Sequence, residues 1–158
     1  MKTVSLLLCL LWLTMPLMAG DVPDFTLDNL DGSVFKISDY MGKRVIIIDF
    51  WATWCKPCKK LLKKLQQIKD EFADDVYVVT ISIDDASALS AVKTYVKGRR
   101  FDFMVLLDPD STVAKMFNPC RKVPFTMMID KQGKIVYTHS GYLPGDEKEL
   151  IKKLKESL

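Results

Sequence analysis

The sequence lacks internal repeats, low-complexity tracts and glycine- or serine-rich linkers, and its 7 glycines and 7 prolines among 158 residues are not an excess. Apolar residues make up 49% of the chain and charged residues 27%, as in ordinary folded proteins, so disorder is not expected. These features predict one continuous globular domain that is long enough to bury a core of its own.

The chain also lacks a strong charge imbalance, because its formal net charge is only +3. No long stripe of interleaved arginine and aromatic residues accompanies this mild excess of positive charge. We therefore expect no nucleic-acid partner.

Histidine and cysteine are scarce, with one histidine and four cysteines in the whole chain. A tetrahedral metal site needs four ligands. The pair Cys55 and Cys58 forms the single C-x-x-C sequence, and the only further candidates in the expected domain are Cys120 and His139. We therefore expect neither a metal ion nor another bound cofactor.

The first twenty residues, MKTVSLLLCLLWLTMPLMAG, have the layout of a secretory signal peptide. Lys2 precedes an apolar stretch from Leu6 to Leu13, and the small residues Ala19 and Gly20 follow. An uncleaved membrane anchor is the alternative. We expect residues 1–20 to be a signal peptide or anchor, residues 21–158 to form the domain, and the protein to be exported. In an oxidising compartment a C-x-x-C pair is not interpreted first as a zinc site.

Strand-like and helix-like patterns alternate along the domain. Residues 44–50, RVIIIDF, are β-branched and nearly all apolar, which is typical of a central strand covered on both faces. The segment after the cysteines places Leu61, Leu65 and Ile68 at helical spacing. This order predicts an α/β layered domain with a mixed central sheet. Further strands are expected at 76–83, 103–108, 127–130 and 134–139, a hairpin around 31–32, and helices at 86–97, 111–117 and the C-terminal end.

The stretch WATWCKPCKK favours thiol chemistry. Cys55 follows the predicted central strand and opens the predicted helix, so its sulfur faces free backbone N–H groups and the positive end of the helix dipole. Lys56 adds positive charge, and Pro57 suits the first helical turn. A thiolate stabilised in this way is a nucleophile at neutral pH, and Cys58, one turn further, can resolve a mixed disulfide. A purely structural bridge is the alternative, but a loop this short gives little stabilisation.

Asp49 lies inside the apolar run IIIDF, six residues before Cys55. A buried acid there should have a raised pKa and could exchange a proton with the inner thiol, Cys58. The alternative is an acid at a strand end that is satisfied by backbone N–H groups.

With DFWATWC before the helix and Val123-Pro124-Phe125-Thr126 before the strand MMID, the chain resembles the thioredoxin superfamily. Within it, the chain is similar to the exported thiol-disulfide oxidoreductases related to TlpA and ResA, in the redoxin group. The resemblance implies a thioredoxin-like three-layer fold with helices on both faces of a mixed sheet. It also implies that Cys55 and Cys58 are the redox pair and that Asp49 is the buried acid.

The same resemblance implies a substrate-binding surface and partners. Pro124 matches the family's cis-proline, and Val123 matches the residue whose backbone holds the substrate chain, beside Trp54, Lys56 and Pro57. Trp51 and Trp54 are expected to form an apolar rim around the disulfide. The implied partners are protein thiols and disulfides, such as those of apocytochrome c, and a membrane or envelope electron donor on the periplasmic side.

Three residues have no assigned role in this interpretation. Thr80 stands where thioredoxin has the lysine that pairs with the buried acid. Cys120 is expected to be a small buried apolar residue rather than a third active thiol. His139 is expected at the surface without an acidic partner.

Two other functions are compatible with the pattern. The first is a peroxidase, although Thr53 and Asp49 do not fit the peroxiredoxin P-x-x-x-T-x-x-C pattern. The second is a metal or haem chaperone that uses the thiols as soft ligands.

Overall fold

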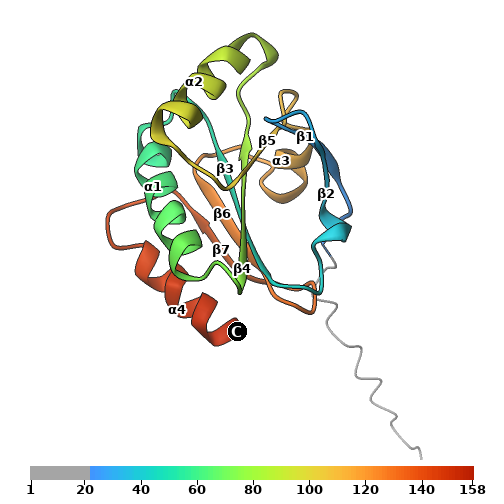
Figure 1. The fold of residues 1–158 in the computed structure, drawn as a ribbon, viewed down its shortest axis with the longest axis vertical. Coiled ribbons are helices and arrows are strands. Elements are labelled where there is room, and N and C mark those ends of the chain that lie inside the picture. The colour runs from blue at the N-terminus through green and yellow to red at the C-terminus, as the bar shows by residue number, and fades with distance from the viewer. Residues whose placement is uncertain (1–21) are drawn as a thin grey trace, which may run out of the picture.

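The computed structural model describes residues 22–158, so the predicted signal segment lies outside the described residues. Seven strands form one sheet in the order β2-β1-β5-β4-β3-β6-β7 (Figure 1). Within residues 22–158, no helix has both the length and the apolar character needed to cross a membrane. The strands are β1 (Thr26–Asn29), β2 (Val34–Lys36), β3 (Val45–Trp51), β4 (Val76–Ser82), β5 (Met104–Leu107), β6 (Phe125–Ile129) and β7 (Ile135–Ser140).

The sheet is mixed, as the sequence predicted. Strands β3, β4 and β5 run parallel to one another, whereas β6 pairs antiparallel with β3 and β7 pairs antiparallel with β6. On the other side, the hairpin of β1 and β2 joins the sheet through an antiparallel pairing of β1 with β5. Because β3 and β4 are parallel, the residues that follow them lie at the same edge of the sheet.

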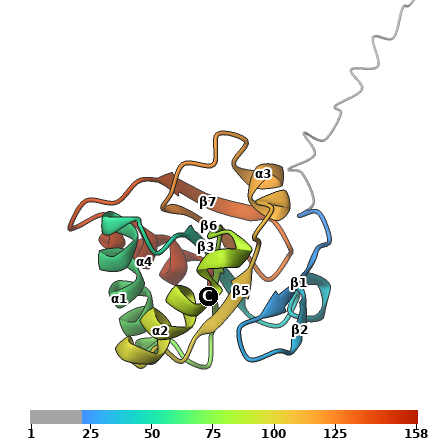
Figure 2. The same ribbon diagram turned by 90° about the horizontal axis from the view of Figure 1, so that it is seen from above.

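Helices cover both faces of the sheet, which gives three layers. Helices α1 (Lys56–Glu71), α2 (Leu89–Arg99) and α4 (Glu147–Ser157) lie on one face, and the short helix α3 (Thr112–Phe117) lies on the other (Figures 1 and 2). The expected helix over 86–97 is divided into a 3-10 turn, Ala86–Ala88, and α2, because Asp85 caps the turn through the backbone N–H of Ser87.

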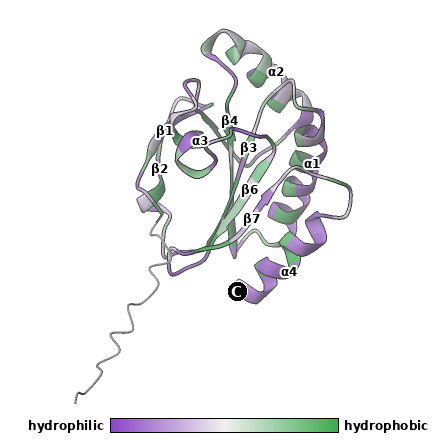
Figure 3. Cartoon of the chain, turned by 180° about the vertical axis from the view of Figure 1, so that it is seen from behind, coloured by the Kyte–Doolittle hydropathy of each residue, from purple (hydrophilic) through white to green (hydrophobic). Residues whose placement is uncertain are grey.

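Two apolar cores stabilise the layers, one on each side of the sheet. The first joins the inner faces of α1, α2 and α4 to β3, and the second joins α3 and the N-terminal hairpin to the opposite face of the same strand. All seven residues of β3 are buried, which explains why this strand reads as an almost unbroken apolar run. Hydrophobic and hydrophilic residues alternate along α1 and α4, as expected for helices with one buried side (Figure 3).

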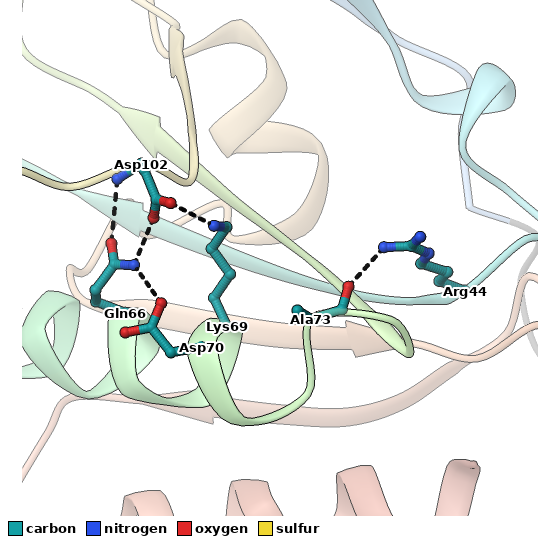
Figure 4. A network of polar contacts seen from close by, with 6 residues as sticks. All are labelled: Arg44, Gln66, Lys69, Asp70, Ala73 and Asp102. Atoms are coloured by element: carbon teal, nitrogen blue, oxygen red, sulfur yellow. Dashed lines mark hydrogen bonds and ion pairs between the residues drawn. The ribbon is translucent and has the colours of Figure 1, made fainter.

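A polar network outside these cores holds α1 against the segment that leads into β5 (Figure 4). The Gln66 side chain donates to Asp102 and accepts from its backbone N–H, and the Lys69 ammonium lies 2.7 Å from the Asp102 carboxylate. These contacts are exposed, so each contributes little to stability. They join the middle of α1 to the segment before β5, while the buried face of the helix packs in the first core.

Candidate active site

Cys55 and Cys58 form a disulfide where β3 ends and α1 begins, with their Cα atoms 5.3 Å apart. Cys55 has an extended backbone and is the N-cap of α1, and Pro57 lies in the first turn. The backbone N–H of Cys58 donates to the Cys55 sulfur at 3.2 Å. A free N–H group of the helix terminus is thus directed at the outer sulfur, which favours its thiolate form after reduction.

The two sulfurs differ in access. Cys58 is completely buried, and Cys55 is buried but next to exposed side chains of Trp54, Lys56 and Pro57. Trp54 is 68% exposed, which is unusual for a tryptophan. The exposed side of the site is therefore formed by Trp54, Lys56 and Pro57, whereas Cys58 has no exposed surface.

The loop before β6 completes this region. The peptide bond between Val123 and Pro124 is cis, and Val123 packs against the apolar core that contains both cysteines. Trp51 packs in the same apolar core as the two cysteines, but it is fully buried and forms no rim at the surface. Its ring is tilted against that of Tyr95, with 5.7 Å between the centroids. Strand alternation directs Trp51 into the core under α1.

Asp49 is fully buried in β3 and is not held by backbone N–H groups at a strand end. Its Oδ1 accepts a hydrogen bond from the Thr126 hydroxyl at 2.9 Å, and its Oδ2 has no hydrogen-bond partner among residues 22–158. Burial raises the pKa of Asp49 to about 8, against the opposing effect of the Thr126 hydrogen bond. Thr80 lies directly opposite Asp49 on β4, but its hydroxyl donates to the Met104 carbonyl.

Asp84 holds the loop between β3 and the cysteines, a role that sequence reasoning missed. Its carboxylate accepts from the Thr53 backbone N–H at 2.8 Å, from the Thr53 hydroxyl at 2.6 Å and from the Ser82 hydroxyl at 2.8 Å. The sequence held a signal for this contact. Asp84 comes two residues after β4 and Thr53 two residues after β3, and residues that follow neighbouring parallel strands lie at the same edge of the sheet. This clamp fixes the loop two residues before Cys55.

The sequence was compared with models of known protein families. Residues 18–138 match the AhpC/TSA family. The chain belongs to this family.

Proteins with sequences similar to this chain include thiol-disulfide oxidoreductases. The chain is 28% identical over 136 residues to the thiol-disulfide oxidoreductase ResA of Bacillus thuringiensis subsp. konkukian, covering 85% of this chain and 76% of ResA. It is 32% identical over 128 residues to the thioredoxin-like protein YneN of Bacillus subtilis, covering 80% of this chain and 74% of that protein.

Solved structures show the same fold. A Chlorobium tepidum protein assigned to the DsbE thiol:disulfide interchange proteins matches with a TM-score of 0.79 and 28% identity, over 87% of this chain and 94% of that one. The exposed lipoprotein thioredoxin of Streptococcus pneumoniae matches with a TM-score of 0.71 and 31% identity, over 85% and 99%. The resemblance to the thioredoxin superfamily is confirmed, and this AhpC/TSA-family chain is a thiol-disulfide oxidoreductase of the ResA and DsbE type.

Two expectations about this family member were wrong. Cys120 is an exposed free thiol in the loop between α3 and β6, because Asn118 and Arg121 fold that loop outward in a turn of its own. His139 has an acidic partner seven residues later, with 3.1 Å between its Nε2 and Asp146 Oδ2. The turn between β7 and α4 brings these two together, and the strand pattern alone did not reveal that turn.

Proposed function

We propose that the protein is exported and reduces disulfides of partner proteins outside the cytoplasm. The observation that carries this proposal is the asymmetry of the disulfide: Cys55 follows an exposed tryptophan, is 4% exposed and has a helix N–H on its sulfur, and Cys58 is completely buried. In this proposal Cys55 reacts with the partner, and Cys58 reacts only within the molecule.

In the reduced protein the Cys55 thiolate attacks one sulfur of a substrate disulfide. A new S–S bond forms between Cys55 and the substrate, and the second substrate sulfur leaves as a thiolate that takes a proton from solvent. The Cys58 thiol then gives its proton to Asp49 in its ionised form, whose share grows as the pH approaches about 8, and attacks Cys55. The substrate leaves with both sulfurs reduced, and the protein keeps the two-electron oxidation as the Cys55–Cys58 disulfide.

The substrate-binding surface in this proposal consists of Trp54, Lys56 and Pro57 together with the loop of Val123 and Pro124. The exposed apolar ring of Trp54 and the flanking lysine suit an extended segment of a partner protein, such as an apocytochrome c thiol segment. A membrane or envelope electron donor would return the disulfide to two thiols. Export is supported by the signal-like residues 1–20 and by the likeness to an exposed lipoprotein thioredoxin.

A redox titration with thiol counting by alkylation and mass tests the class and the direction. A two-electron transition of Cys55 and Cys58 near about −270 mV supports a reductant, and one near about −120 to −180 mV supports an oxidant or isomerase instead. The absence of any transition assignable to this pair would contradict the proposal.

The order of attack is tested separately by substitution. Cys58→Ser should accumulate mixed disulfides between Cys55 and substrate, because the resolving sulfur is gone. Cys58→Ser with full turnover and no trapped complex would contradict the assigned roles.

A further inference from the structure

A row of polar side chains crosses the otherwise apolar sheet in strict register. Thr80 on β4 pairs with Asp49 on β3, Asp49 pairs with Thr126 on β6, and Thr126 pairs with His139 on β7. Directly paired residues project from the same face of a sheet, so all four lie under α1 and α4. Within this row Thr80 and Asp49 are completely buried. At the outer end, the side chain of His139 is 38% exposed.

Hydrogen bonds are formed at the inner end of this row and beyond its outer end. The Thr126 hydroxyl donates to Asp49 Oδ1 at 2.9 Å, and at the outer end His139 Nε2 lies 3.1 Å from Asp146 Oδ2. Between the two pairs lies a cavity of about 10 Å³, lined by Thr126, His139, Asp146, Tyr142, Tyr137 and Glu147 together with the apolar Leu61 and Leu150. That volume is at the lower limit for one water molecule, for which Thr126 and His139 are polar partners. One bridging water there would complete a chain from Asp49 to the surface.

Asp49 needs such a connection if it takes the proton of Cys58. It is fully buried, and the Thr126 hydroxyl is the hydrogen-bond partner of its carboxylate in the described structure. A hydroxyl accepts one proton while it releases another, so it can transmit a proton without changing its own charge. Histidine is the side chain that binds and releases protons around neutral pH.

We infer that Thr126 and His139 connect Asp49 to solvent as a proton path, with Asp146 holding the outer histidine. This inference rests on the proposed function, because the proton comes from Cys58 when that thiol resolves a mixed disulfide. Once Asp49 is protonated, the Thr126 hydroxyl turns its hydrogen from Asp49 Oδ1 toward the cavity. Asp49 then passes its proton to the Thr126 oxygen, while the Thr126 hydroxyl proton moves through the bridging water to His139. His139 then releases a proton to solvent, and the path returns to its starting state.

The tyrosine rings beside His139 do not ionise in the working range. Burial raises the pKa of Tyr137, and burial with the Glu147 contact raises the pKa of Tyr142 to about 12, so both rings stay neutral in the working range. The titratable groups that face His139 are Tyr137 on β7, Tyr142, Asp146, Glu147 and Glu149 around the start of α4, and Lys64 on α1, which pairs with Glu147.

The reaction of the reduced protein carrying Cys120→Ser with an aromatic disulfide, 5,5′-dithiobis(2-nitrobenzoate), separates the two steps. This substitution serves as the background for every variant, because the exposed Cys120 thiol would release a further coloured thiolate. Attack by Cys55 releases one coloured thiolate, and resolution by Cys58 releases the second. The first phase reports an intact site, and the second phase reports the step that needs a proton acceptor. Both phases are followed between about pH 6 and pH 9 in buffers of increasing concentration.

For His139→Gln we expect the second phase to slow about three- to tenfold near pH 7, to lose its pH dependence in the neutral range and to recover when imidazole is added. Thr126→Val should slow the second phase about tenfold without rescue by imidazole, whereas Thr126→Ser should retain the wild-type rate. Thr138→Val, on the opposite face of β7, is the matched control and should behave as wild type.

The equilibrium thiol-disulfide constant of His139→Gln should equal that of the wild type, because a proton path changes a rate and not an equilibrium. Unchanged second phases in both His139→Gln and Thr126→Val, with normal first phases, would overturn the proton path and leave the proposed function intact. A wild-type protein with no second phase would instead contradict the proposed function itself.

Discussion

The cysteines among residues 22–158 lie in two kinds of environment. Cys55 and Cys58 lie where a buried strand meets a helix N-terminus, in contact with an apolar core, a backbone N–H and each other. Cys120 lies in an exposed loop whose own hydrogen bonds run between Asn118 and the residues up to Lys122. The difference shows that position sets thiol chemistry here: a sulfur becomes a redox group where the fold supplies a partner sulfur and stabilises its charge.

The strongest test of this contrast replaces one thiol from each environment. We expect Cys55→Ser to lower disulfide reduction below detection, because a serine hydroxyl does not attack disulfides under these conditions. Cys120→Ser is the matched control and should retain wild-type turnover. Insulin reduction monitored by turbidity measures both variants, and a large loss with Cys120→Ser would remove the distinction between the two environments.

The second prediction concerns the buried acid behind the redox pair. The pKa of Asp49 in the folded protein is about 8 against an ordinary value of 3.8, so the folded state holds a proton that the unfolded chain releases. Stability from this group is complete below about pH 4 and is lost as the pH rises through about 8. Over that range the free energy of unfolding should fall by on the order of a few kcal/mol, and Asp49→Asn should abolish most of this decline.

Urea unfolding of the oxidised protein between about pH 5 and pH 9 measures this effect. Asp74→Asn, at an exposed position, serves as the control for a general loss of acidic charge. A wild-type protein whose stability is flat over the interval would show that Asp49 is ionised in the folded state, contrary to the structure.

The third prediction concerns the clamp that makes the cysteine environment rigid. Asp84→Ala leaves the Thr53 N–H and hydroxyl and the Ser82 hydroxyl without their acceptor, so the protein should lose about 1–3 kcal/mol of stability. Thr53→Val removes one of these bonds and should cost less. Thermal unfolding together with the rate of Cys55 alkylation after reduction distinguishes a loosened loop from a general loss of stability.

The smallest effect is expected at Cys120. In the folded, oxidised protein its thiol should react with iodoacetamide as fast as an ordinary surface cysteine, identified by peptide mass, and Cys120→Ser should change stability by no more than about 0.5 kcal/mol. Slow labelling that requires unfolding would place Cys120 in a protected environment after all.

Local sequence signals predicted much of the fold and part of the site. The apolar run before the cysteines, the helical spacing of Leu61, Leu65 and Ile68, and the placement of Cys55 at a helix start all correspond to observed features. These predictions succeed because strand burial and helix amphipathicity depend on residues that are close together in the sequence. Asp84 and the pairing of His139 with Asp146 were missed because each depends on which segments lie side by side.

The sequence by itself determined an α/β domain with a C-x-x-C pair at a strand-to-helix junction, because residue spacing controls local conformation and its burial. Only the tertiary structure decided the surroundings of that pair. It placed Asp49 in one row with Thr126 and His139, tied Thr53 to Asp84, and exposed Cys120. Those relations arise from strand order and register, which bring residues far apart in the chain within hydrogen-bond distance.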